Sequence, residues 1–215
     1  MKEASAAGRL QDEFEVRTHE ALLQLYGEPA EASLRKEVDY LHPLYQRYVQ
    51  ASPFVALATS GPEGLDVSPR GDPAGFVQVL DEKTLLLPDR RGNKRIDSLR
   101  NILHDPRVAL LFLIPGAGET LRINGRAAIS TDPQWLERFS VGAAKPLSVL
   151  KIAVETVFFQ CSRATLRARL WESDAHVQPG SLPSAGTILE ALSQARIDGR
   201  RYDAELPERL RQTLY

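Results

Sequence analysis

The chain has 215 residues, of which 43% are hydrophobic and 26% are charged, and its 27 basic residues are balanced by 28 acidic ones. This composition is that of a globular protein and excludes a disordered or fibrous chain, while a formal net charge of −1 speaks against extended nucleic-acid binding. With Cys161 as its single cysteine, the chain forms no internal disulfide and no cysteine-based zinc cluster.

The first residues, MKEASAAGRLQDEFEV, lack the continuous apolar core of a signal peptide. No stretch of the chain approaches the roughly 18 apolar residues that a membrane span requires. We therefore expect a cytoplasmic protein with neither a membrane nor a nucleic acid as a partner.

Helices are predicted before residue 52. Apolar residues recur at three- and four-residue spacings from Leu10 to Tyr26, which predicts an amphipathic helix there. Residues 31–50 are also predicted to be helical, with a break or restart at Pro43. We interpret residues 1–51 as a helical extension packed on the domain that follows.

Short apolar runs with many β-branched residues follow this extension. They are separated by turn residues such as Gly, Pro and Asp and lie at 54–59, 65–70, 76–80, 84–87, 108–114, 120–130 and 148–161. Short strands with regular turn signals favour an antiparallel barrel or sandwich over alternating parallel units. The core is therefore predicted to be mostly β, from about residue 52 to residue 161.

Further helices interrupt or follow these strands. A segment rich in Gly, Ser and Pro at 179–184 predicts a linker before the last two of them. The predicted helices span 93–104, 132–141, 187–197 and 204–214. In the first, Ile96, Leu99 and Leu103 share one face and are expected to pack on the strands.

Basic residues gather between strand 84–87 and the helix after it. The stretch PDRRGNKRIDSLRNI, residues 88–102, holds five Arg or Lys residues. Asn93 is a candidate N-cap, so the first N–H groups of the helix would form an anion site. That site would be surrounded by Arg90, Arg91, Lys94 and Arg95. From these residues alone, a solvated surface loop is an equal alternative.

A second charged patch, DVSPRGD at 66–72, lies on the returning strand of the first hairpin. By strand alternation Ser68 and Arg70 share a face and can reach one ligand, whereas Val67 points to the core. Pro69 restricts this strand to an edge or a bulge. Taken alone, the patch favours exposed charge at the end of a hairpin.

The sequence shows little sign of a metal site or of a hydrolytic active site. The four histidines are scattered without metal-ligand spacing, and no nucleophile-elbow pattern occurs. Cys161, at the end of an apolar strand, is expected to be a buried small hydrophobe. No metal site is predicted, and no catalytic side chain is identified.

Several segments occur in an order typical of one family: SPFVALATSGPEGLDVSPRG, TLLLPDRRGNKRIDSLRNIL, DPRVALLFLIPGAGETLRINGRAAIS, FFQCSRATLRARLWES and DGRRYDAELPERLRQTLY. In this order they resemble the pyridoxamine 5′-phosphate oxidase-like, FMN-binding split-barrel superfamily, and within it a bacterial group of FMN-dependent enzymes. The resemblance implies a mainly β (α+β) fold, a six-stranded antiparallel split β-barrel with flanking helices at the N- and C-termini. The barrel domain would span 52–178, and residues 179–215 would form a linker and C-terminal helices.

The resemblance also implies a homodimer that binds FMN in a cleft at the subunit interface. Asn93, Lys94 and Arg95 occupy the place of the segment that holds the FMN phosphate in the family's oxidases. Ser68 and Arg70 lie on the strand that supplies further phosphate and ring contacts. A phosphate dianion is well served by Arg and Lys, which agrees with this expectation.

Contacts with the rest of the cofactor are implied for a second group of residues. Pro88 and Asp89 match positions beside the ribityl chain and the flavin ring, and Arg90 follows them directly. Thr120 and Arg122 are placed to contact the polar edge of the ring.

The implied function is an oxidoreductase that exchanges hydride between FMN and a small substrate or a nicotinamide. The family's oxidases grip a pyridoxal substrate with a C-terminal segment onto which residues 167–176 do not align. Lys145, Arg167 and Trp171 are expected to line a different substrate pocket, or to be ordinary packing residues. The alternatives are a non-catalytic flavin carrier or sensor, and a split barrel that uses haem or a deazaflavin.

Overall fold

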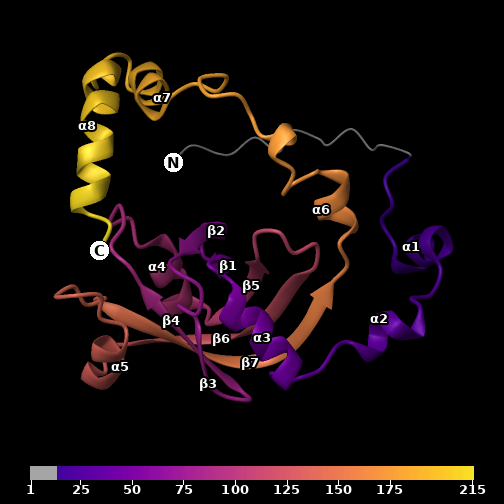
Figure 1. The fold of residues 1–215 in the computed structure, drawn as a ribbon. Coiled ribbons are helices and arrows are strands. Elements are labelled where there is room, and N and C mark those ends of the chain that lie inside the picture. The colour runs from indigo at the N-terminus through magenta and orange to yellow at the C-terminus, as the bar shows by residue number, and fades with distance from the viewer. Residues whose placement is uncertain (1–13) are drawn as a thin grey trace, which may run out of the picture. The chain divides into compact units, whose positions relative to one another are not determined.

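The structure, a computed structural model, describes residues 14–215 and divides the chain into two compact units, Met1–Lys36 and Glu37–Tyr215 (Figure 1). In the described part of the first unit lie α1 (His19–Tyr26) and α2 (Glu31–Arg35). The prediction of a helix from Leu10 is wrong over 14–18, and residues 10–13 lie outside the described residues. The helix begins at His19 because the Thr18 hydroxyl accepts a hydrogen bond from the Ala21 N–H (3.1 Å), which caps it.

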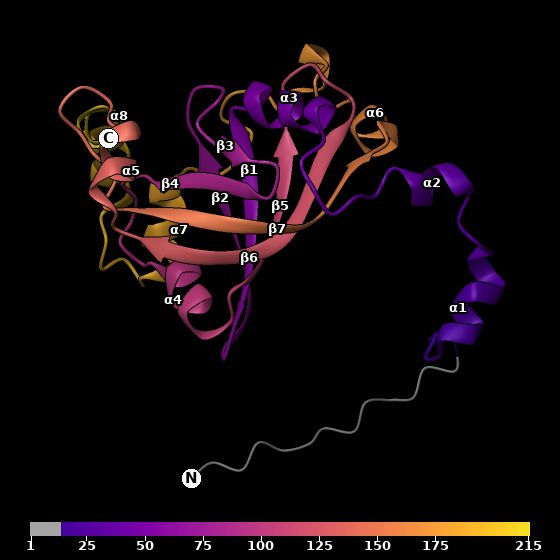
Figure 2. The ribbon, with the colours of Figure 1, turned by 90° about the horizontal axis from the view of Figure 1, so that it is seen from below.

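The second unit is built on one antiparallel sheet in the order β2-β1-β5-β6-β7-β4-β3. Its strands are β1 (Phe54–Gly61), β2 (Gly64–Gly71), β3 (Gln78–Asp81), β4 (Thr84–Asp89), β5 (Arg107–Leu113), β6 (Thr120–Ser130) and β7 (Ser148–Gln160). The sheet curls around its core (Figure 2), which confirms the mainly β split barrel with flanking helices. The strand number is seven, not six, because the short β3 pairs with β4 and adds an edge strand.

Helices flank this sheet and connect its strands. They are α3 (Pro43–Ala51), α4 (Asp97–His104), α5 (Pro133–Arg138), α6 (Arg163–Arg167), α7 (Ala185–Leu192) and α8 (Gly199–Gln212), with a 3-10 turn at Ser173–Ala175. The restart at Pro43 is confirmed, since Pro suits the first turn of a helix, but the helix predicted over 31–50 is wrong over 36–42. The five-residue α6 was not predicted.

Alternating burial along the strands explains why they form. In β5 the side chains of Val108, Leu110 and Phe112 face the core, while the residues between them are less buried. The strand β4 differs, since it is buried from Thr84 to Pro88. Leu85 and Leu87 belong to the main core, and Leu86 belongs to a second cluster on the other face. This buried strand ends at Asp89 and therefore fixes the position of the basic loop after it.

The strand β6 bends at a bulge between Asn124 and Gly125. A Cβ atom at Gly125 would lie 2.1 Å from the backbone oxygen of Ala153 on β7. Only glycine permits this close approach of the two strands, and the bulge lets the long sheet curl.

Four side chains that were predicted to be buried are exposed, among them Ile96, which is 48% exposed and lies before the first residue of α4. Val67 is 67% exposed because it faces away from the core on the edge strand β2. Leu103 is 78% exposed because α4 turns Ile102 toward the sheet instead. Cys161 is exposed because β7 ends one residue before it.

Among residues 14–215, no helix has both the length and the apolar character needed to cross a membrane.

Candidate functional site

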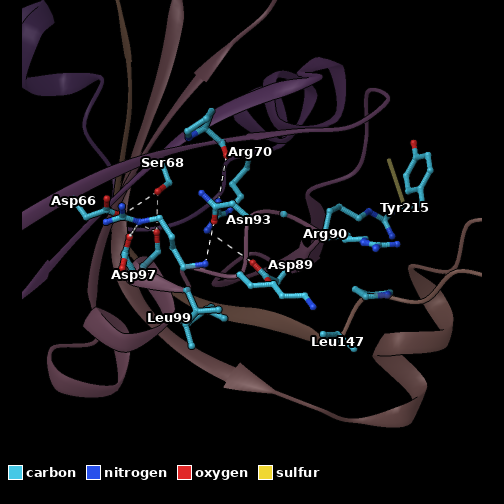
Figure 3. Close-up of a pocket in the computed structure, with 18 of the residues that line it drawn as sticks. Asp66, Ser68, Arg70, Asp89, Arg90, Asn93, Asp97, Leu99, Leu147 and Tyr215 are labelled. Carbon is cyan, nitrogen blue, oxygen red and sulfur yellow. Dashed lines mark hydrogen bonds and ion pairs between the residues drawn. The ribbon is translucent and has the colours of Figure 1, made fainter. Parts of the chain in front are cut away.

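A cavity of about 880 Å³ opens where β2, the end of β4, the loop 90–96 and the start of α4 meet (Figure 3). Its volume lies in the range of about 300–1,000 Å³ that is typical of small-molecule pockets. It is lined by Asp66, Ser68, Pro69, Arg70, Asp89, Arg90, Arg91, Gly92, Asn93, Lys94, Arg95, Ile96, Asp97, Ser98, Leu99, Ala144, Lys145, Pro146, Leu147 and Tyr215.

Much of the predicted cofactor site comes together in this cavity. Two segments that are about twenty residues apart in the sequence, one on β2 and one after β4, supply most of these residues. The predicted residues that line it are Ser68, Arg70, Asp89, Arg90, Asn93, Lys94, Arg95 and Lys145. Ser68 and Arg70 share a face of β2, as strand alternation predicts.

The other predicted residues lie elsewhere. Pro88 is buried within β4. Arg122 on β6 lies over the Phe158 ring, with its guanidinium carbon 5.5 Å from the ring centroid, and Thr120 is on the same strand. Their contacts with a cofactor stay predictions.

The two remaining substrate-pocket candidates also lie outside this cavity. Arg167 ends α6, and the Trp171 indole N–H donates to the Ala117 carbonyl (2.6 Å). A substrate role for them stays a prediction.

Positive charge prevails in the cavity. Six basic and three acidic side chains line it, a surplus of three positive charges. Arg95 pairs with Asp97 (2.7 Å), whereas Arg91 and Lys94 make no ion pair with any residue that the structure describes. The cavity therefore suits an anion.

Arg70 and Arg90 are the least exposed of these cations, and Arg70 differs from Arg90 in its hydrogen bonding. The Nη2 of Arg70 lies 3.8 Å from Asp89 Oδ1, and its side chain is 23% exposed. Its Nε is buried and finds no hydrogen-bond partner among residues 14–215. A buried N–H without an acceptor costs about 1–3 kcal/mol, and a bound ligand that accepts a hydrogen bond would remove this cost. This unpaired donor is the strongest local indication of a ligand.

Hydroxyl groups join β2 to α4 at the other end of the cavity. The Ser68 and Ser98 hydroxyls donate to the same oxygen of Asp66, at 3.0 and 2.8 Å. Ser98 is 2% exposed. Sequence reasoning missed Ser98, because nothing local distinguishes it from a surface serine in a polar helix turn. The hydrogen bonds hold the walls of the cavity in place.

The basic loop differs from its prediction in one respect. Asn93 does not cap the helix, because its side-chain oxygen accepts from the Arg95 N–H (3.0 Å) and closes a local turn. The helix begins at Asp97, after Ile96 with φ 53°. A β-branched residue in this left-handed region costs about 1–3 kcal/mol. The cations thus stand on a constrained loop rather than around a helix N-terminus.

Asp89 carries an unfavourable charge. Burial raises the pKa of its carboxyl, and the neighbouring Arg70 opposes only part of that rise. Such an acid binds its proton more tightly in the folded than in the unfolded chain. Its contribution to stability is therefore present below its ordinary pKa of about 3.9 and is lost as pH rises through the folded pKa.

Replacing Asp89 with asparagine is expected to abolish this titration. The free energy of unfolding of the wild type minus that of Asp89→Asn should fall as pH rises from about 4 toward neutrality, as measured by urea denaturation. Asp105→Asn is the control, since Arg107 lowers the pKa of Asp105 to about 2, mainly by a side-chain hydrogen bond. Its difference should not fall over the same range, and a difference for Asp89→Asn that does not fall either would contradict the prediction.

Tyr215 reaches this cavity from the far end of the sequence. Its hydroxyl donates to Asp72 Oδ1 (2.8 Å), and Arg90 Nε donates to Asp72 Oδ2 (2.6 Å). Sequence reasoning missed this contact, because 143 residues separate Tyr215 from Asp72 and no local pattern marks either residue as a partner of the other.

Comparison with known proteins agrees with this architecture. Residues 41–161 match the family model described as pyridoxamine 5′-phosphate oxidase. None of the curated proteins matches the chain.

Solved structures resemble part of the chain. HupZ from Group A Streptococcus is 20% identical over 54% of this chain and 91% of that chain, with a TM-score of 0.44. An FMN-binding protein from Syntrophomonas wolfei is 10% identical over 65% and 95%, with a TM-score of 0.43. A general stress protein 26-related protein of the pyridoxinephosphate oxidase family from Clostridium acetobutylicum is 15% identical over 54% and 84%, with a TM-score of 0.40.

Proposed function

The chain belongs to the pyridoxamine 5′-phosphate oxidase family, and from this premise we propose that it is a flavoprotein that binds FMN in the cavity beside β2 and β4. FMN combines a dianionic phosphate with a flat, mostly apolar ring. The observation that carries the proposal is the buried, unpaired Nε of Arg70 in a cavity with surplus positive charge. A phosphate oxygen is an acceptor that would satisfy this donor.

The phosphate would be held by residues from both walls of the cavity. Arg70 and Ser68 approach from β2, and Asn93, Lys94 and Arg95 approach from the loop. Lys94, which has no ion-pair partner among the described residues, supplies a charge that no side chain neutralises. Apolar side chains of the same cavity would cover the ring.

We further propose that the protein is an oxidoreductase whose second reactant is a small substrate or a nicotinamide. Bound FMN supplies hydride exchange at its ring. The residues of the chain bind and orient the cofactor and keep water from its covered face. Lys145, which lines the cavity and pairs with Glu137, is the substrate-side candidate that the geometry favours over Arg167 and Trp171.

A non-catalytic flavin carrier or sensor is the second candidate. It is favoured by the lining of the cavity, whose described residues include no His and no Cys. His and Cys are the side chains whose ordinary pKa values lie nearest to neutral pH, so this pocket has no ready proton donor or acceptor of that kind. Rapid bleaching of the bound flavin by NADH or NADPH in a stopped-flow instrument would rule this candidate out.

The absorption spectrum of the purified protein tests the cofactor directly. A flavin spectrum, or a flavin spectrum regained on titration of the apoprotein with FMN, is the expected result. A haem or deazaflavin spectrum would assign a different cofactor to the barrel. Absence of flavin absorbance together with failure to bind added FMN would overturn the proposal.

We also propose that the protein is a homodimer with FMN at the subunit interface. Leu65 and Val67, 88% and 67% exposed, present apolar side chains on the edge strand β2, on the face opposite to Ser68 and Arg70. A second copy would cover them. Light scattering should give twice the chain mass of 23.9 kDa, and the mass of a single chain would contradict the dimer.

A cytoplasmic location is proposed as well. The support for it is chemical, because a protein with one exposed cysteine and no disulfide suits a reducing compartment. Fractionation of the cells that produce it is the test.

A further inference from the structure

The helices α7 and α8 pack on each other as a hairpin. A Cβ atom at Gly186 would lie 2.1 Å from the Gly199 carbonyl oxygen, so the two helices touch backbone to backbone. The Gly186 N–H also donates to Asp203 Oδ1 (2.8 Å). These contacts fix α7 and α8 against each other.

Tyr215 fastens this hairpin to the barrel. Its hydroxyl donates to Asp72, and its ring lies under the guanidinium of Arg90, so it joins residues 185–215 to the barrel. Figure 1 shows α8, in yellow, leading to the chain end beside the sheet. The hairpin is thus attached to the barrel by the covalent segment before it and by the side chain of Tyr215.

The acceptor of the Tyr215 hydroxyl is a buried and fixed carboxylate. The Asp72 side chain is 3% exposed, and its other oxygen binds Arg90. Arg90 in turn donates to the Phe139 carbonyl (2.6 Å) and lies over the Tyr215 ring, 5.4 Å from the centroid. A buried charge held by several partners does not move readily, so it is a firm anchor.

The Tyr215 hydroxyl acts as a donor at this anchor. Its pKa is raised, mainly by the hydrogen bond to Asp72 and also by burial. The phenol therefore keeps its proton at neutral pH, and it is not suited to act as a base.

The Tyr215 ring forms one wall of the cavity. Figure 3 shows Tyr215, Arg90 and Leu147 at the end away from Asp66 and Ser68. The cavity therefore has a polar end formed by β2 and α4, and an end where an aromatic ring and an apolar side chain stand beside a cation. A ligand with a charged group at one end and a flat ring at the other matches this division.

We propose that Tyr215 closes the cofactor pocket over the ring of the bound flavin, and that its hydrogen bond to Asp72 keeps the α7–α8 hairpin shut. The inference rests on the proposed FMN site. FMN enters and leaves when this hydrogen bond breaks and the hairpin moves aside. Tyr215 is thus both a wall of the pocket and the latch that retains the cofactor.

The variant Tyr215→Phe tests the latch, since it keeps the ring and removes the hydroxyl. We expect FMN to dissociate about tenfold faster, because a hydrogen bond to a charged, buried acceptor is lost. Association should also accelerate, since the closed hairpin no longer limits entry. Both rates are measured by stopped-flow fluorescence of FMN, on dilution of the loaded protein and on mixing of the apoprotein with FMN.

Limited proteolysis provides a second readout that does not need the cofactor. The segment 176–184 before the hairpin is exposed, and in apo Tyr215→Phe it should be cut several times faster than in the wild type. The matched control is Tyr202→Phe on α8, whose ring packs under Arg209 (4.3 Å from the centroid). Its FMN exchange rates and its cleavage should equal those of the wild type.

The outcomes separate this inference from the proposed function. Wild-type protein that binds FMN while Tyr215→Phe exchanges it at the wild-type rates would overturn the latch and leave the FMN site standing. Unchanged cleavage of apo Tyr215→Phe would show that Tyr215 does not hold the hairpin. Wild-type protein that binds no FMN would overturn the proposed function and this inference with it.

Discussion

Replacing Arg70 with alanine is expected to weaken FMN binding by about 10- to 150-fold. This range corresponds to the loss of one charge-assisted hydrogen bond, which contributes about 1.5–3 kcal/mol. Arg70 is chosen because its Nε is buried and unpaired, so the side chain has already lost water and has a free donor for the ligand. Titration of the apoprotein with FMN, followed by flavin fluorescence, measures the dissociation constant.

Two variants control for other effects of this change. Arg70→Ala leaves the Asp89 carboxylate without the guanidinium that lies 3.8 Å away. The double variant Arg70→Ala/Asp89→Asn removes that charge, and it should still bind FMN more weakly than Asp89→Asn alone. Arg100→Ala changes an exposed cation of α4 outside the cavity and should leave the affinity unaltered. Wild-type affinity in Arg70→Ala would place the phosphate elsewhere.

A second large effect is expected at Ile102. Its side chain is 4% exposed and belongs to the main core beneath α4. Ile102→Ala should lower the free energy of unfolding by about 2–5 kcal/mol, through lost burial and the cavity that remains. Because α4 contributes Ser98 and Leu99 to the cavity, the same variant should loosen one of its walls. Urea denaturation gives the change in stability.

Leu103, the next residue, is the matched control. It is 78% exposed, so Leu103→Ala should change the free energy of unfolding by no more than about 0.5 kcal/mol. The helix pattern in the sequence predicted the opposite order, with Leu103 on the packed face. A larger loss for Leu103→Ala than for Ile102→Ala would support that pattern and contradict the structure.

The strands of the barrel could be predicted from the sequence because their information is local. Alternation of apolar residues, as in β5, and turn residues between the runs depend on neighbours in the chain. The seven apolar runs also agree with the seven strands in number, whereas the six strands implied by the family resemblance do not. Whether the short β3 joins the sheet depends on its pairing with β4, and that pairing is a tertiary contact.

The start of α4, and with it the face that α4 packs on the sheet, was predicted wrongly because of one residue. Asn93 has the side chain of a good N-cap, and a helix that started there would bury Ile96, Leu99 and Leu103 together. In the structure Asn93 bonds to Arg95, two residues on, and the helix starts four residues later. Whether Asn93 caps a helix or closes a turn depends on where β4 and the sheet place the loop. The spacing of apolar residues in the sequence carries no information about that placement.

In the candidate site too, residues marked by a local pattern could be predicted and residues that depend on distant partners could not. Ser68, Arg70 and the 93–95 segment were accessible from the sequence because charge gathers in two short stretches. Ser98, Asp72 and Tyr215 were not, since each acquires its role through a partner at least 30 residues away. A hydrogen bond between residues far apart in the sequence produces no repeating pattern in the sequence.

The long separation between Tyr215 and Asp72 bears on the order in which the protein is made. Synthesis at about 5–20 residues per second places roughly 7–29 s between the two residues, which are 143 positions apart. The barrel that carries Arg70 and Lys94 is complete well before Tyr215 exists. If Tyr215 closes the pocket as proposed, newly made chains would present an open pocket for seconds before Tyr215 can bond to Asp72.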